Sequence, residues 1–510
     1  GAVSATDAQG NPAVIVGDKG DNGWWRGSGT FKVAYDLDDD SKAAFSFMRS
    51  EYEYNYGDPH TYLRDAPGNP VWSGTLNSNG NRFSLYEYNF LSSGGGRTDN
   101  IYHLDYNTRI FSDALLKVSC GLIDVEGNWY VTPGSTRATT RSGGPGKINE
   151  TPSQSFQSDL QVSIPILEKH VLTTGVAFRY DHANTEEHSL SDWRDRRSKG
   201  SLSYESEGKD NIFSVYTQAE IALLTNLTAY LGVRGDYWEA YDGSVNQVGS
   251  TGYPREFDSK NSFAVSPKAA LVYKPLDTTT LRGSVGQSFR PPNVYELYRT
   301  WVSGTVTYAS NPDLDPETCF SWDLGVEQKL GEKALLRLTY FENTLRDLIY
   351  RLDVSPTLKE SINAGKAETY GLEIGYEHKV TDWMKLFGSY TYTSSEMLEN
   401  PAKPSTVGKR LTGVPENMFN IGGEFTGGPF SLTATGRYVD KQYNNDENTD
   451  TASGVPNVYD SFFVADVSLR WKVKPWATLV FSVDNVFDEH YFSYYQSPGR
   501  KFFGGLTMKF

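Results

Sequence analysis

Apolar and polar residues alternate along most of the chain, which predicts β-strands rather than helices. Between positions 463 and 473, apolar residues such as Val467 and Leu469 alternate with polar residues such as Ser468 and Arg470. A period of two places the apolar side chains on one face of a strand, whereas a helix would scatter them around its circumference. We therefore expect Leu469 and Arg470 to point to opposite sides of a sheet.

The last twelve residues, 499–510, form a further predicted strand that ends on the aromatic residue Phe510. Phe502, Leu506 and Met508 share one face, and Lys509 lies on the other. This segment resembles the closing strand of bacterial outer-membrane β-barrels, in which a terminal aromatic residue belongs to the assembly signal. We expect Leu506, like Leu469, to face lipid, and Lys509, like Arg470, to face the lumen.

Short turns alternate with long polar connections along the chain. The expected tight turns are 38–42, 111–114, 167–170, 224–227, 274–279, 330–333, 379–382, 426–429 and 473–476. The long connections are 56–98, 132–154, 187–204, 242–261, 290–315 and 443–458. Hairpins with short turns at one end and long loops at the other are typical of the periplasmic and extracellular ends of a membrane barrel.

The composition of the chain is polar on average, but this does not argue against a membrane β-barrel. Mean hydropathy is -0.51, 22% of the residues are charged, and 14% are aromatic. No apolar run approaches the ~18 residues of a transmembrane helix, whereas a barrel alternates its apolar content with lumen-facing polar residues. We therefore predict an all-β fold, a transmembrane antiparallel β-barrel.

The number and direction of the strands suggest that more chain belongs in front. Nine hairpins and the closing strand give roughly nineteen strands, while bacterial single-chain barrels have even totals and barrels of about 22 strands have plugged lumens. The first expected strand, 30–37, runs into a tight turn, so residues 1–28 are expected to be the remnant of an extracellular loop and 29–510 the barrel. We expect a plug domain and three strands to be missing, and unpaired edges on the strands 30–37 and 499–510.

The net charge and the two cysteines bear on two further questions, nucleic-acid binding and disulfide formation. The net charge of -15, without basic stripes, argues against nucleic acid as a partner. Cys120 shares its face with leucines and Cys319 shares its face with polar residues, so no disulfide is expected between them.

Several motifs in the second half of the chain resemble the TonB-dependent receptors. The motifs are 288–292 (SFRPP) leading to 296–298 (ELY), 311–318 (NPDLDPET), 363–368 (NAGKAE), 414–417 (VPEN) and 484–488 (DNVFD) followed by Tyr491. The residues of the first two motifs that carry the resemblance are Phe289, Arg290, Pro291, Glu296, Asn311, Pro312 and Glu317. Their structural interpretation is that prolines end one strand and turn residues restart the next.

The resemblance implies active transport of a metal chelate across the outer membrane of a Gram-negative bacterium, without enzymatic chemistry. It implies contact with the TonB complex through the missing plug, and with outer-membrane lipid and lipopolysaccharide. We expect a ferric siderophore as ligand, with cobalamin or another organometallic compound as the alternative. A passive channel and an outer-membrane protease are rival functions. The haem-binding branch has a histidine between the first two motifs, and residues 293–310 contain none.

Candidate binding residues lie in the expected external loops. Five aromatic residues there offer rings on which a partly apolar chelate could stack: Trp24, Trp25, Tyr298, Trp301 and Tyr308. No cofactor is expected, but the acidic loop 444–450 carries Asp446, Glu447 and Asp450, whose oxygens suit a structural calcium ion. The seven histidines are scattered without metal-ligand spacing.

Overall fold

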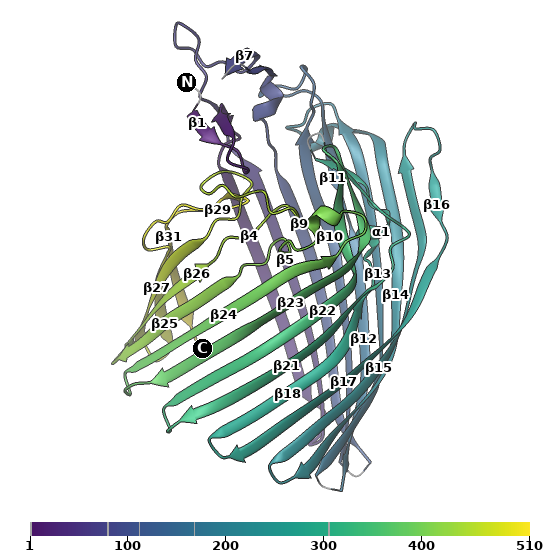
Figure 1. The fold of residues 1–510 in the computed structure, drawn as a ribbon, viewed down its shortest axis with the longest axis vertical. Helices are drawn as coiled ribbons and strands as arrows, with labels where there is room; N and C mark the ends of the chain where they lie inside the picture. The colour runs from purple at the N-terminus through teal and green to yellow at the C-terminus, as the bar shows by residue number, and fades with distance from the viewer. Residues whose placement is uncertain (1–2, 79–80, 112, 168, 304–305, 510) are drawn as a thin grey trace.

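The alternating segments form long antiparallel strands that follow one another round a barrel (Figure 1). The computed structural model describes residues 3–78, 81–111, 113–167, 169–303 and 306–509. In this part of the chain the barrel has nineteen long strands: β4 (Asn22–Asp36), β5 (Ser41–Tyr56), β9 (Gly95–Ile110), β10 (Ala114–Pro133), β12 (Ser153–Ile166), β13 (His170–Leu190), β14 (Lys199–Leu224), β15 (Leu227–Gln247), β17 (Lys260–Leu276), β18 (Thr279–Arg290), β21 (Glu317–Leu330), β22 (Ala334–Ser355), β23 (Leu358–Lys379), β24 (Met384–Glu399), β25 (Asn417–Gly427), β26 (Phe430–Val439), β27 (Phe462–Lys474), β28 (Ala477–Asp484) and β31 (Lys501–Met508).

Shorter strands and helices lie at the end of the barrel that carries the long connections. They are β1 (Val3–Thr6), β2 (Pro12–Ile15), β3 (Gly17–Asp18), β6 (His60–Thr61), β7 (Gly74–Ser78), β8 (Asn81–Leu85), β11 (Gly146–Glu150), β16 (Arg255–Phe257), β19 (Trp301–Ser303), β20 (Val306–Ala309), β29 (Phe492–Ser493) and β30 (Tyr495–Gln496), with the helix α1 (Val294–Tyr298) and three 3₁₀-helices, Glu87–Phe90, Arg196–Ser198 and Pro404–Thr406. Among the described residues, every helix is too short to cross a membrane.

Each of the nine expected tight turns lies between two antiparallel strands, at the same end of the barrel (Figure 1). Seven of these turns are confirmed, whereas 111–114 and 167–170 each contain one residue, 112 and 168, that lies outside the described residues. The opposite end carries the six expected long connections and two that the sequence did not single out, 400–416 and 485–500. It also carries the hairpin of β22 and β23, whose two strands of 22 residues are joined only by Pro356 and Thr357. Strand length varies strongly round the barrel, from 26 residues in β14 to 8 in β31.

The registers confirm the predicted outward faces of Leu469 and Leu506. Leu469 lies opposite Leu432 on one neighbouring strand and Phe481 on the other, and Leu506 lies opposite Leu479. Phe481 and Leu506 are 51% and 58% exposed. Apolar side chains in rows on the outside of a barrel are the surface that meets lipid.

The two ends of the chain differ in detail from the expectation. The first long strand begins at Asn22 rather than near residue 30, so residues 22–28 are strand and not loop. Residues 3–18 contain the hairpin of β1 and β2 and the strand β3, which pairs with β6. The closing strand is Lys501–Met508, and the expected terminal aromatic Phe510 lies outside the described residues.

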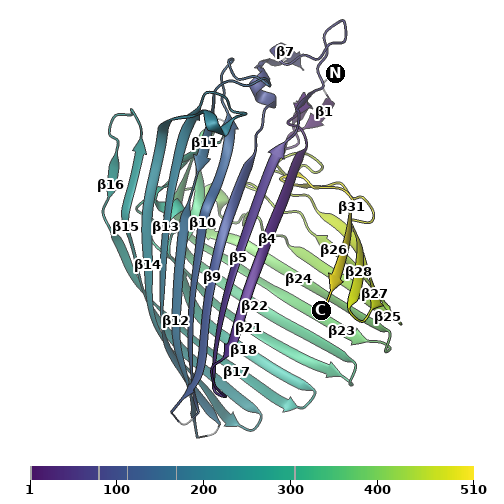
Figure 2. The same cartoon turned by 180° about the vertical axis from the view of Figure 1, so that it is seen from behind.

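β31 and β4 follow each other where the strand order returns to its start, on the same side of the barrel (Figure 2). Residue-by-residue pairing ties β4 to β5 and β31 to β28, and within the described ranges no register joins β31 to β4. All fifteen residues of β4 are exposed, as are all but one of β31. The exposure of both strands agrees with the absence of a register between them over the described residues. The barrel is therefore closed in strand order, with a seam between β31 and β4 that lacks a registered ladder. The expectation of additional strands at this seam stays a prediction.

Both cysteines are free, as expected from their opposite faces.

Candidate functional site

The mouth of the barrel, at the end with the long connections, contains the helix α1, packed against the inner wall. Val294, Leu297 and Tyr298 of α1 are buried and form an apolar cluster with Trp238 and Ala240 of β15. On the neighbouring strand β14, Phe213 and Val215 point to the side opposite the cluster, and their side chains are exposed on the outside of the barrel. Hence α1 covers the lumen face of these strands.

Arg290, in the first family motif, fastens α1 to the ends of two barrel strands. Its Nε donates to Glu317 Oε1 at 2.6 Å, and its Nη1 donates to Glu296 Oε2 at 3.0 Å. Glu317 Oε2 also accepts the backbone N–H of Ile349 at 2.7 Å. Asn293 and Glu296 close a capping box at the start of α1. One guanidinium thus joins β18, α1 and β21.

Residues of the second family motif also hold α1 in place. The backbone N–H of Asn311 donates to Glu296 O at 2.9 Å, and Asn311 Nδ2 donates to Ser361 O at 3.0 Å. Leu314 is fully buried in the α1 cluster, and Phe289 packs against it. Pro291 lines the lumen cavity beside Arg290, and Pro312 follows Asn311 in the turn. The structural interpretation of the motif residues is therefore supported.

Tyr298 is a packing residue in this structure, which corrects its assignment to an external ligand-binding loop. Its side chain is 2% exposed and stacks on Phe257 with ring centroids 5.6 Å apart. It fits because Gly208 and Gly243 leave room, since a Cβ at either position would lie 2.4 or 2.3 Å from the Tyr298 ring. Burial, assisted by the negative charge of Asp210, raises the pKa of Tyr298 to about 12.

Trp301 and Tyr308 are brought together, on the paired strands β19 and β20. Their rings are stacked, with centroids 3.8 Å apart and an interplanar angle of 3°. The guanidinium of Arg351 lies 5.2 Å and the ammonium of Lys359 6.0 Å from the centre of the Tyr308 ring. Lys359 is also paired with Asp353 at 2.8 Å. The pair is a partly buried aromatic and cationic group, and its contact with ligand stays a prediction.

Trp24 and Trp25 lie on the strand β4 and not in a loop. Because neighbouring residues of a strand point to opposite sides, only one of them can face the lumen. Trp25 lies on the same face of β4 as Phe31 and Val33, which are exposed on the outside together with Phe45, the partner of Val33. Trp24 therefore points to the lumen side of the mouth, and Trp25 points away from it.

The lumen side of β4, β5 and β9 near the mouth carries a group of residues that the sequence analysis did not single out. Tyr52 lies opposite Arg26 of β4 and Arg97 of β9. Tyr54, one row nearer the rim, lies opposite Trp24 and Gly95. The available signal was the run 51–56 (EYEYNY), which places tyrosines at every second position.

The acidic loop is held by protein donors. Lys403 Nζ lies 2.9 Å from Asp446 Oδ1, and Tyr350 Oη donates to the same carboxylate. Glu447 accepts from Ser405 Oγ at 2.9 Å, and this bond and the charge of Lys403 lower the pKa of Glu447. Asp450, 1% exposed, accepts the backbone N–H of Asn444 at 2.7 Å. The three carboxylates do not form a common group of metal ligands, and the calcium ion stays a prediction.

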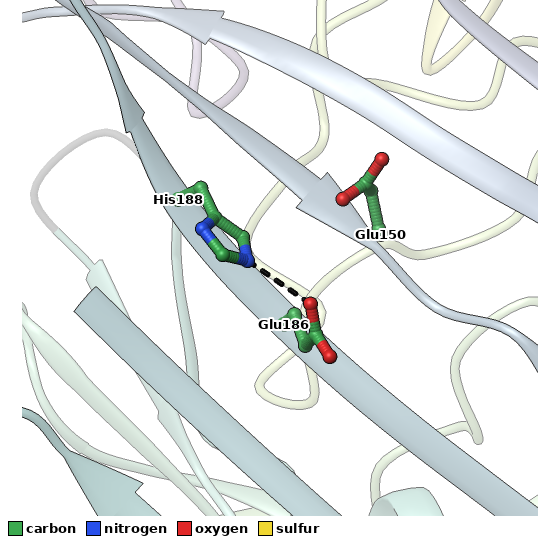
Figure 3. Close-up of side chains that lie close together, drawn as sticks. All are labelled: Glu150, Glu186 and His188. Atoms are coloured by element: carbon green, nitrogen blue, oxygen red, sulfur yellow. Dashed lines mark hydrogen bonds and ion pairs between the residues drawn. The ribbon is translucent and has the colours of Figure 1, made fainter. Parts of the chain in front are cut away.

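A different group of ligand-type side chains lies on β11 and β13: Glu150, Glu186 and His188 (Figure 3). His188 Nε2 is 3.0 Å from Glu186 Oε2, and His188 Nδ1 is 3.2 Å from Gly200 O. Lys199 forms an ion pair with Glu150 and lies 4.0 Å from Glu186. This ammonium supplies the positive charge that the two carboxylates need. Glu150 is far in the sequence from Glu186 and His188, so spacing alone could not reveal the group.

The inner wall below the mouth is polar, as a barrel lumen requires. A cavity of about 630 Å³ is lined by residues of several neighbouring strands, among them Arg179, Ser214, Arg234, Asp236 and Arg290. Arg234 Nε donates to Asp236 Oδ1 at 2.7 Å, and Ser214 Oγ donates to the same oxygen at 2.6 Å. The charges of this wall are thus largely paired with one another.

Comparison with known proteins agrees with this architecture. The family described as TonB dependent receptor-like, beta-barrel matches residues 5–486. The iron-regulated outer membrane virulence protein of Vibrio cholerae serotype O1 (strain O395) is 27% identical over 331 residues, which are 61% of this chain and 49% of that protein. The probable TonB-dependent siderophore receptor PiuA of Acinetobacter baumannii is 25% identical over 297 residues, which are 55% of this chain and 37% of that protein.

Solved structures share the fold. The siderophore receptor PiuA from Acinetobacter baumannii has a TM-score of 0.71 at 17% identity, covering 97% of this chain and 76% of that one. The copper transporter OprC has a TM-score of 0.71 at 16% identity, covering 99% of this chain and 74% of that one. The chain spans about half or less of the length of these two curated relatives. With the barrel, the fastened α1 and the family match over most of its length, the chain belongs to the TonB-dependent receptors, β-barrel proteins of the Gram-negative outer membrane.

Proposed function

We propose that this chain forms the barrel of a receptor that imports a ferric siderophore across the outer membrane with energy from the TonB complex. The observation that carries the proposal is the mouth, which contains lumen-facing rings and cations on β4 and β5 and a helix fastened by family-motif residues to another part of the wall. The names of the relatives, an iron-regulated protein and a siderophore receptor, support iron as the cargo.

In this proposal transport involves no covalent chemistry. The mouth binds the chelate, and contact with the TonB complex is made through a plug domain that is not among these residues. The outer rows of apolar side chains contact lipid, and the rim above them contacts lipopolysaccharide. Cobalamin or another organometallic ligand, and passive diffusion, are the competing functions.

The test is uptake of ⁵⁵Fe-labelled siderophores by cells that express the protein containing this chain, with and without an active TonB complex. We expect uptake that depends on TonB, and transcription of the locus that falls when iron is supplied. Uptake of labelled cobalamin instead, or a steady conductance of the purified protein in planar bilayers, would contradict the proposal.

A further inference from the structure

We propose that the lumen-facing group Trp24, Arg26, Tyr52, Tyr54 and Arg97, here called the mouth patch, binds chelates whose iron-binding groups are anionic aromatic rings, the catecholate class. This inference rests on the proposed function and names the ligand class and the residues of its binding site.

The rings of the mouth patch are close together but leave their faces open. The ring centroids of Trp24 and Tyr52 are 6.2 Å apart at an interplanar angle of 46°, and those of Tyr52 and Tyr54 are 6.0 Å apart at 33°. Trp24 and Tyr52 are 66% and 38% exposed. A planar guest can therefore lie against them, and aromatic contacts favour offset or tilted rings at 4.5–7 Å.

The stacked pair of Trp301 and Tyr308 is a poorer candidate for the same role. At 3.8 Å and 3° the two rings already cover one face of each other. Its nearby cations are also partly used, since Lys359 is paired with Asp353.

Two arginines flank Tyr52 on the same face. Arg26 Nε donates to Ser50 Oγ at 3.2 Å, and among the described residues no carboxylate lies within ion-pair distance of Arg26. Arg97 is paired with Asp99 at 2.7 Å. Within the described part of the chain, Arg26 thus adds a positive charge beside the rings that no carboxylate pairs with. A chain with a net charge of -15 repels anions on average, so an anionic guest needs such a local cation.

The patch is held in place before any ligand arrives. Tyr54 lies directly over Gly95, where a Cβ would be 2.6 Å from the Tyr54 ring. The backbone of Tyr52 is held by the two ladders that join β5 to β4 and β9, and its ring contacts those of Trp24 and Tyr54. Rings that are already ordered lose less conformational entropy when they bind.

Ring and charge together select among iron chelates. A catecholate complex offers planar rings and a net negative charge, which match both features. A hydroxamate complex lacks the aromatic ligand groups, and citrate offers negative charge without a ring. We therefore expect the affinity to follow the order catecholate, then citrate, then hydroxamate.

The experiment measures equilibrium binding of three ⁵⁵Fe complexes to the full-length receptor containing this chain, purified in detergent. The probes are a ferric tris-catecholate built on dihydroxybenzoyl groups, ferric citrate and a ferric trihydroxamate. The variants are Trp24→Leu and Arg26→Gln, with Arg26→Lys, which keeps the charge. Trp25→Leu is the matched control, because it removes the same side chain from the opposite face. Folding of each variant is checked by the heat-dependent gel mobility of barrels.

Trp24→Leu should weaken catecholate binding about 2- to 10-fold, the range of one aromatic contact. Arg26→Gln should weaken it about 10-fold, and Arg26→Lys should weaken it less than Arg26→Gln. Trp25→Leu should bind as the parent does. Equal losses in the two tryptophan variants, or tighter binding of hydroxamate or citrate than of catecholate, would overturn this inference and leave the proposed function standing. Failure to bind any of the three iron complexes would overturn both.

Discussion

Arg290 at the end of β18 and Glu317 at the start of β21 form an ion pair with 2.6 Å between Nε and Oε1, and so close the connection that carries α1. Arg290→Met removes the charged donor of two carboxylates, which keep the backbone N–H donors of Ile349 and Asn293. We expect α1 to lose about 1–2 kcal/mol of docking free energy, at the low end for charged hydrogen bonds because Arg290 is half-exposed.

The measurement is hydrogen exchange of the α1 amides, which should become faster in Arg290→Met. Arg337→Met is a matched control, because Arg337 also bridges two glutamates, at 3.0 Å each, with a similar exposure, in a different part of the barrel. Equal acceleration of α1 exchange in both variants would show that the Arg290 bridge has no local role.

Gly243 is expected to be essential for the close contact between β15 and α1. In Gly243→Ala the new methyl group meets the Tyr298 ring at 2.3 Å, and overpacking of this kind costs about 1–3 kcal/mol. Trypsin should then cleave after Arg299 faster than in the parent protein. Gly427→Ala, where no atom lies within 4 Å of the new Cβ, should leave cleavage unchanged. Unchanged cleavage in Gly243→Ala would mean that the contact relaxes at no cost.

The orientation of the barrel can be tested by cysteine labelling on intact cells. After replacement of Cys120 and Cys319 by serine, Ser142→Cys and Ser453→Cys in the long connections should react with an impermeant thiol reagent. Glu332→Cys, in the tight turn between β21 and β22, should react only after the outer membrane is opened. Gly144 is less suitable, since its φ is +106° and a Cβ there would lie 2.1 Å from Ala138 O. Labelling of Glu332→Cys on intact cells would reverse the topology.

The faces of β27 predict different costs for neighbouring substitutions. Leu469→Arg places a charge among Leu432 and Phe481 on the lipid side and should destabilise the barrel by about 2–4 kcal/mol near mid-membrane. Arg470→Gln, on the lumen side, should cost far less. Reversible folding into lipid vesicles measures both, and the opposite ranking would show that the faces are exchanged.

Sequence patterns predicted most of the barrel because its turns and faces are local properties. Each tight turn, such as 330–333, needs only a few residues between two alternating segments. The start of β4 was missed because 22–29 (NGWWRGSG) contains three glycines and two adjacent tryptophans, which hide the alternation.

The site could be predicted only in part, because its contacts depend on register. Trp301 and Tyr308 could be proposed as loop aromatics, but the burial of Tyr298 follows from Gly208 and Gly243 on other strands. Likewise, Arg26, Tyr52 and Arg97 meet only because three strands align them in one row. No spacing along a single segment contains this information.

The difference in height between the walls has a consequence for how solutes reach the mouth. At about 3.3 Å per residue, the 26 residues of β14 have a contour length of about 86 Å, whereas the 8 residues of β31 have about 26 Å. The rim therefore slopes, and its low side lies at the strands next to β4. We expect molecules that diffuse along the cell surface to enter over this low side rather than over the long strands around β14.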